Sequence, residues 1–188
     1  MTDDKTPPRP RKPPKRVTAP YLEAAALHYL ERFAASTAGL RRVLMAKVDR
    51  SAHAHGTNRE DGARIIEDLI RKFQRLGYLN DAEFARARAA SLHRRGASTR
   101  AIREKLATKG VDSDAVDAAL AEVAQDTDGE VDVAAAVALA RRRRLGPFRD
   151  PAKRDELRDK DLAALARAGF SYDIARRVVD ADDPDDVN

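Results

Sequence analysis

The chain has 188 residues, and its 36 lysines and arginines outnumber its 31 acidic residues, which gives a net charge of +5. Cysteine is absent, which excludes a disulfide framework, thiol catalysis and a cysteine-ligated zinc site. No apolar run approaches the roughly 20 residues that cross a bilayer, and the first sixteen residues lack the apolar segment of a secretory signal. We therefore expect a protein of the cytoplasm that makes no membrane contact.

The composition favours helices. Alanine accounts for 36 residues and aromatic residues for only 5%, so large side chains that could fill one deep core are scarce. Such chains favour helices that pack closely through small residues, and no segment shows the alternation of a strand. The exception is the proline-rich, basic stretch 1–20, for which we expect a disordered arm because proline removes backbone donors.

Helices are predicted from residue 21 onward. Apolar residues at helical spacing predict a first helix over residues 21–33. Ser36 or Thr37 then caps a second helix. After a polar break, Thr57 and Glu60 form a capping box that predicts the start of a third helix.

The third helix is predicted to end at Gly77, since glycine readily adopts the left-handed conformation that closes a helix end. The apolar residue that follows, Tyr78, is then expected to fold back on Phe73. The same pattern of a helix, a glycine and an apolar residue recurs at Gly110 and Gly169. Further helices are predicted over residues 81–93, 115–124, 134–144, 159–168 and 172–179, and Gly96 is followed by another helix whose Ile102 and Leu106 point inward. Their expected caps are Asn80, Ser98 or Thr99, Asp112 or Ser113, and Ser171.

Two internal matches indicate a repeat. The sequence ASTAGLRRVL (35–44) aligns without gaps on ASTRAIREKL (97–106), and KLATKGVDSDAVDAAL (105–120) aligns on ALARAGFSYDIARRVV (164–179). Units this small must share a core with their neighbours, as in repeat arrays. The alternative is that glycine stops and serine caps are general features of helix ends.

We therefore predict an all-α fold, a tandem array of three-helix repeats that is elongated and curved. The expected segments are the arm 1–20, a first repeat 21–55, a central repeat 56–126 with its connecting helix, a third repeat 127–179 and an acidic tail 180–188.

Positive charge is concentrated in one segment. Residues 84–110 hold eight lysines and arginines against Glu104 alone, a net charge of +7. A basic stripe of this kind fits a polyanion or an acidic protein groove, although a solvated helix surface has the same pattern. A second stripe ends the helix at 134–144, where cations are also favoured by the helix dipole. The candidate partner-binding residues are Arg86, Arg88, Arg94, Arg95, Arg100, Arg103, Lys109, Arg141, Arg142, Arg143 and Arg144.

No catalytic or cofactor site is expected. The sequence has no glycine-rich phosphate loop that ends in Lys-Ser or Lys-Thr, so we expect no nucleotide hydrolysis. His53 and His55 stand on a break without further ligands nearby, so no metal site is predicted. Carboxylates of the tail such as Asp182 and Asp183 have nothing to bury or polarise them, which leaves acid–base catalysis without support.

The sequence GYLNDAEFARARAASLHRRGASTRAIREKLATKGVD (77–112) resembles the central repeat of the RecX regulatory family, and GFSYDIARRVV (169–179) is similar to the closing helix of that family. The resemblance covers residues 21–179. The arm, the tail and the connection 147–153 depart from the family pattern. The matching positions are Gly77, Tyr78, Leu79, Asp81, Phe84, Ala85, Gly96, Ile102, Arg103, Leu106, Lys109 and Gly110.

The resemblance implies a monomeric, non-catalytic protein that binds the RecA recombinase and its filament on DNA. Such a protein restrains strand exchange and ATP hydrolysis, in DNA repair, recombination and the SOS response. A direct DNA contact is also compatible with the basic stripe. The alternative from a different class is a stand-alone DNA-binding helical protein that uses the stripe and the arm.

Overall fold

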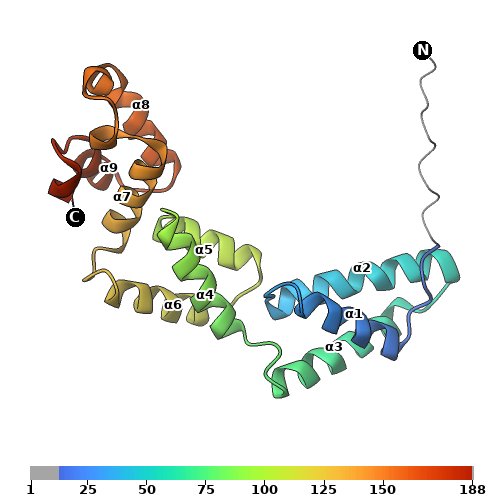
Figure 1. Cartoon of the computed structure of the whole chain (residues 1–188). Helices are drawn as coiled ribbons and strands as arrows, with labels where there is room; N and C mark the ends of the chain where they lie inside the picture. Colours follow the sequence, from blue (N-terminus) through green and yellow to red (C-terminus); the bar gives the residue numbers. More distant parts are fainter. Residues whose placement is uncertain (1–12, 188) are drawn as a thin grey trace, which may run out of the picture. The chain divides into compact units, whose positions relative to one another are not determined.

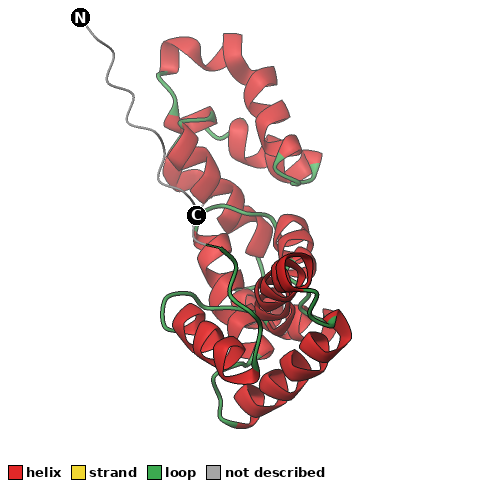
Figure 2. Ribbon diagram, turned by 90° about the vertical axis from the view of Figure 1, so that its right-hand side faces the viewer, coloured by secondary structure: helices red, strands yellow, loops and turns green. Residues whose placement is uncertain are grey.

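The computed structural model describes residues 13–187 of the chain, and within this range it contains helices and loops only (Figure 2). The first twelve residues of the predicted basic arm lie outside the described part. No helix between residues 13 and 187 is long and apolar enough to cross a membrane. The described residues divide into two compact units, residues 13–34 with 39–79 and residues 35–38 with 80–187.

The first unit is built from α1 (Ala19–Leu30), α2 (Thr37–His55) and α3 (Arg59–Arg75), as Figure 1 shows. Gly62 lets α3 approach α2 closely, since a Cβ there would lie 2.5 Å from Val48 Cγ1. The three helices enclose one apolar cluster. Its buried members are Leu22, Ala26, Leu40, Leu44, Val48, Ile66, Leu69, Ile70, Phe73 and Leu79.

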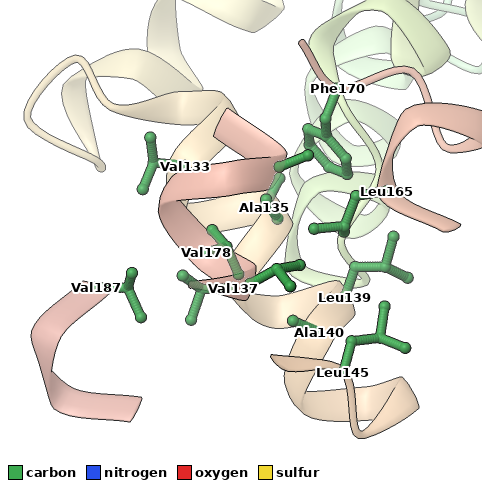
Figure 3. Close-up of a cluster of buried hydrophobic side chains, with 13 residues drawn as sticks. Val133, Ala135, Val137, Leu139, Ala140, Leu145, Leu165, Phe170, Val178 and Val187 are labelled. Atoms are coloured by element: carbon green, nitrogen blue, oxygen red, sulfur yellow. The ribbon is translucent and has the colours of Figure 1, made fainter. Parts of the chain in front are cut away.

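The second unit contains two further groups of three helices. The first group comprises α4 (Asp81–Arg94), α5 (Thr99–Thr108) and α6 (Ser113–Gln125). The other comprises α7 (Val131–Arg143), α8 (Arg154–Arg167) and α9 (Tyr172–Val179), with short 3-10 helices at Gly146–Phe148, Pro151–Lys153 and Pro184–Val187. Each group has its own apolar cluster, and Figure 3 shows side chains of α7 in the last of them, with Leu165, Phe170 and Val178 around them. The predicted all-α fold of three-helix repeats is confirmed.

The glycine stops adopt the predicted geometry. Gly77, Gly110 and Gly169 have φ values of +76°, +73° and +94°. At the first stop, Tyr78 N–H donates to the carbonyl of Phe73 at 2.9 Å, and the two rings meet edge to face with centroids 5.9 Å apart. The helix end is thus closed by a hydrogen bond and an apolar contact together.

Most predicted helix caps are confirmed, and one is wrong. The side chains of Asn80, Ser98, Asp112 and Ser171 accept hydrogen bonds from the first turns of their helices. The cap of α3, however, is Asn58 and not Thr57, because Asn58 Oδ1 accepts from Glu60 N–H at 2.7 Å. Thr57 Oγ1 instead donates to Ser51 Oγ at 3.0 Å. Asparagine caps at least as well as threonine, so the partner available to Thr57 in α2 decides between them.

Two helices of the last group begin earlier than predicted. α7 starts at Val131 instead of residue 134, and α8 starts at Arg154 instead of residue 159. The first turn of α8 carries Asp155 and Glu156, which favour a helix N-terminus through the dipole. This stretch has no apolar periodicity, so the sequence pattern did not reveal the additional turn.

The acidic C-terminal segment folds onto the last group of helices. Arg158 holds the carboxylate of Asp180 through two hydrogen bonds of 2.6 and 2.7 Å, and Arg154 donates to the carbonyl of Asp182 at 2.8 Å. Val187 is only 3% exposed and belongs to the apolar cluster of α7, α8 and α9, as its position in Figure 3 shows. Arg158 lowers the pKa of the Asp180 carboxyl by hydrogen bonding to its charged form.

Candidate polyanion-binding surface

All eleven candidate cations lie in the second unit with exposed side chains. Those of α4 and α5 are separated from those of α7 by more than thirty residues of sequence. Gly96 brings the two sets together, because it lies against the backbone of α7. A Cβ at Gly96 would stand 2.6 Å from Leu139 N and 2.7 Å from Leu139 Cα, closer than real side chains come. The end of α4 therefore lies directly beside α7.

Three of the predicted cations are paired with carboxylates of the protein itself. Arg103 forms an ion pair with Asp117 of α6. Arg86 lies 3.6 Å from a carboxylate oxygen of Glu122, also of α6, and Arg100 lies 3.2 Å from Glu104. Exposed pairs add little stability, but they offset the charge of the stripe. The sequence did not reveal Asp117 and Glu122 as partners because they come after the basic segment and reach it only through the packing of α6 on α4 and α5.

Five of the other predicted cations lie on either side of α7, namely Arg94, Arg95 and residues 141–143. A hollow of about 460 Å³ is lined by five cationic side chains, supplied by the end of α4, by α5, by α7 and by α8. These five residues define the basic hollow: Arg95, Lys105, Arg142, Arg143 and Arg167. Small and apolar residues, among them Gly96, Ala97 and Leu139, complete its lining, and no carboxylate takes part.

A second hollow of about 450 Å³ lies between α4 and α7 and is lined by Arg94, Arg141 and Arg142. Arg142 thus lines both hollows. Arg141 also stacks on the Phe148 ring at 5.4 Å, and Arg95 donates to Ser91 Oγ at 2.7 Å. Among residues 13–187 no ion pair involves any of the cations that line the two hollows.

The structure thus places the cations at the end of α4 beside those at the end of α7, although they belong to two separate predicted stripes. Arg94, Arg95 and residues 141–143 contribute to the hollows, whereas Arg88, Lys109 and Arg144 are exposed and line neither. Lys105 and Arg167 were not among the predicted site residues. Lys105 belongs to the basic segment, so the sequence could have predicted it. Arg167 is an isolated cation in the third repeat, and no sequence pattern indicates that it belongs to the site.

The turn after α7 is held by a buried carboxylate. Asp161 of α8, which is 2% exposed, accepts from Gly146 N–H at 2.9 Å and from the Arg149 guanidinium at 3.0 and 2.6 Å. The hydrogen bond to the Asp161 carboxylate raises the pKa of Arg149. Arg144 ends α7 in the left-handed conformation, with φ +55°. The network therefore fixes the end of the helix that carries residues 141–144.

No metal centre accompanies this surface. Between residues 13 and 187 there is no group of three or more histidine, aspartate or glutamate side chains that could hold a metal ion. His55, one of the two histidines considered from the sequence, donates a 2.7 Å hydrogen bond from Nε2 to the carbonyl of Pro14. Its ring therefore has a contact in the first unit.

Comparison with known proteins identifies the family. The family model described as "RecX, second three-helix domain" matches residues 80–120. A curated relative named "Regulatory protein RecX", from Myxococcus xanthus, is 46% identical over 179 residues, which cover 95% of this chain and 94% of the relative. The chain belongs to the RecX family. A RecX protein from Deinococcus radiodurans is 31% identical over 186 residues and has 79% of its length covered.

A solved RecX structure has the same fold. The crystal structure of RecX from Lactobacillus salivarius superposes with a TM-score of 0.57, covering 86% of this chain and 94% of that chain at 23% identity. The residues matched by the RecX family model span α4, α5 and the first part of α6, with the turns between them. The RecX resemblance predicted from residues 77–112 and 169–179 is confirmed.

Proposed function

We propose that this RecX-family protein is a non-catalytic regulator that binds RecA and the RecA–DNA filament in the cytoplasm and restrains ATP hydrolysis and strand exchange. The observation that carries the proposal is the family itself, because relatives that align over nearly the whole chain are named regulatory proteins. The protein acts as a monomer in this proposal. Its role lies in the control of recombination and DNA repair.

The basic surface supports the proposal on physical grounds. A filament on DNA presents phosphates and acidic side chains, and unpaired arginines recognise both through their forked donors. The proposed contact residues remain the eleven predicted cations. Those that line the hollows are free to bind at once, whereas Arg86, Arg100 and Arg103 must first exchange a carboxylate of their own surface.

Co-sedimentation with RecA filaments assembled on single-stranded DNA tests this function. We expect the protein to pellet with filaments and to stay in the supernatant with RecA alone or DNA alone at physiological salt. Equal pelleting with naked DNA would favour the alternative of a stand-alone DNA-binding protein, whose affinity should fall steeply with salt. Absence from the filament pellet would contradict the proposal.

A further inference from the structure

The basic hollow combines high charge with the absence of internal compensation. Five cations from four helical segments line about 460 Å³, and none of them forms an ion pair with another described residue. The second unit does contain acidic residues that could have formed ion pairs with these cations. Its C-terminal segment pairs with other arginines instead, Asp180 with Arg158 and Arg176.

The helix dipoles balance only part of this charge. Each of the five cations lies at the C-terminal end of a helix, with Arg95 at the cap of α4, Lys105 in the last turn of α5, Arg142 and Arg143 in that of α7, and Arg167 in that of α8. A helix end carries only about half an elementary negative charge, so four ends offset about two of the five positive charges. Like charges gathered at one place repel one another, and the positive excess that remains favours an anion at this place.

The charge density favours phosphate over carboxylate as this anion. A condensed phosphate, or adjacent phosphates of a strand, places several negative charges and many acceptor oxygens within a small volume. Arginine forks match those oxygens in pairs, and the Lys105 ammonium adds a point charge. The lining contains no aromatic side chain on which a base could stack, so recognition rests on the phosphate groups.

We propose that the basic hollow is a binding site for clustered phosphate groups, supplied by a condensed phosphate or by the backbone of a nucleic-acid strand. Arg142 is central to it because this residue also lines the second hollow, so phosphates can continue from one side of α7 to the other. The inference goes beyond the proposed function, since it is tested without the recombinase and can hold or fail independently.

Titration of the full chain with two probes tests the site. Inorganic triphosphate represents the condensed source, and a fluorescent twelve-residue oligothymidylate represents the strand. Binding is measured by calorimetry and by fluorescence anisotropy, at low and at physiological salt. Binding of triphosphate identifies a condensed source, and binding of the oligonucleotide alone identifies the strand; either result supports the site.

The decisive comparison uses variants with the same change in net charge. The double variant R142Q/R143Q should lose on the order of 10-fold or more in affinity, because two charge-assisted contacts are removed. The control K153Q/K160Q removes two exposed cations of the same helical group that line neither hollow, and it should change affinity less than about 2-fold. If circular dichroism shows that the double variant folds poorly, Arg167→Gln is used instead, because Arg167 lines the same hollow from α8. Equal losses in both sets, or no binding of either probe to the unmodified chain, would overturn the proposal.

Discussion

Ser98 Oγ donates a 2.9 Å hydrogen bond to the carbonyl of Ala168, a residue 70 positions later in the chain. Ala168 directly precedes the glycine stop at Gly169, and a Cβ on that glycine would come within 2.7 Å of Ser98 Oγ. The same contact recurs within the second unit, where Ser36 Oγ donates to the carbonyl of Lys109 at 2.5 Å, just before Gly110.

The threonines beside these serines repeat a second contact. Thr99 N–H donates to Asp132 Oδ1 at 2.7 Å, and Thr37 N–H donates to Asp81 Oδ1 at the same distance. The repeated Ala-Ser-Thr sequence therefore encodes a contact between a helix start and the second of the glycine stops that follow it in the chain. This contact explains why the sequence repeat and the glycine stops occur together.

Ser98→Ala should destabilise the protein by about 1–3 kcal/mol, because the half-buried carbonyl of Ala168 loses its donor and α5 loses its cap. Ser171→Ala is the matched control, since the side chain of Ser171 caps α9 and is exposed. It should cost about 1 kcal/mol. Urea unfolding followed by circular dichroism measures both, and equal losses would show that the Ala168 contact adds nothing.

Gly96→Ala should cost more stability than Gly77→Ala. Both glycines have φ +76°, so alanine is strained by about 1 kcal/mol at either position. At Gly77 a Cβ meets no atom within 4 Å, but at Gly96 it meets the backbone of Leu139. We expect an additional loss of at least about 1 kcal/mol at Gly96 from overpacking, measured by thermal unfolding. Similar losses at both sites would contradict the close crossing of α4 and α7.

Replacing Arg144 with glycine should stabilise the chain by about 0.5–1 kcal/mol, because glycine adopts the left-handed conformation without a steric penalty. Arg143→Gly removes the same charge one residue earlier, inside α7, and should destabilise by about 1 kcal/mol. Opposite signs in chemical unfolding are the expected result. Destabilisation by both substitutions would show that the Arg144 side chain contributes to folding.

Stability should fall in acid as the pair between Asp180 and Arg158 is lost. The pKa of Asp180 is lower in the folded chain than in the unfolded one, so the pair stabilises the fold above the ordinary aspartate pKa of about 3.9 and is lost as the pH falls through the lowered value. Asp180→Asn should therefore weaken the protein at pH 7 and reduce its loss of stability between about pH 5 and 3.

The control for this pH series is Asp182→Asn, because the Asp182 carboxylate has no hydrogen-bond or ion-pair partner among residues 13–187. Its urea unfolding curves should follow those of the unmodified protein at each pH. An unchanged pH dependence in Asp180→Asn would remove this pair from the account of acid unfolding.

The helix caps and glycine stops could be predicted from the sequence because they depend on contacts between residues close together in the chain. Gly77, Asn80 and Ser98 act on backbone groups a few residues away, so their roles follow from sequence spacing alone. The start of α8 could not be predicted, since charged residues without apolar periodicity give no helical pattern. Thr57 shows the limit of the local rules, because a partner in another helix decided which residue became the cap.

The candidate site depends on packing over longer distances. The sequence predicted the cations of α4, α5 and α7, but the contact of Gly96 with α7 decides which of them share a surface. Asp117 compensates Arg103, and Arg167 joins the basic hollow, only because their helices pack there. A count of charges along the chain detects neither effect.

Regulation of RecA by this protein is measured through the DNA-dependent ATPase of RecA. The rate is measured on filaments formed with single-stranded DNA while the purified protein is titrated to the concentration of filament subunits. We predict that the unmodified protein and K153Q/K160Q lower the rate progressively, and that R142Q/R143Q requires a higher concentration. An ATPase rate that stays unchanged at that concentration of the unmodified protein would contradict the proposed function.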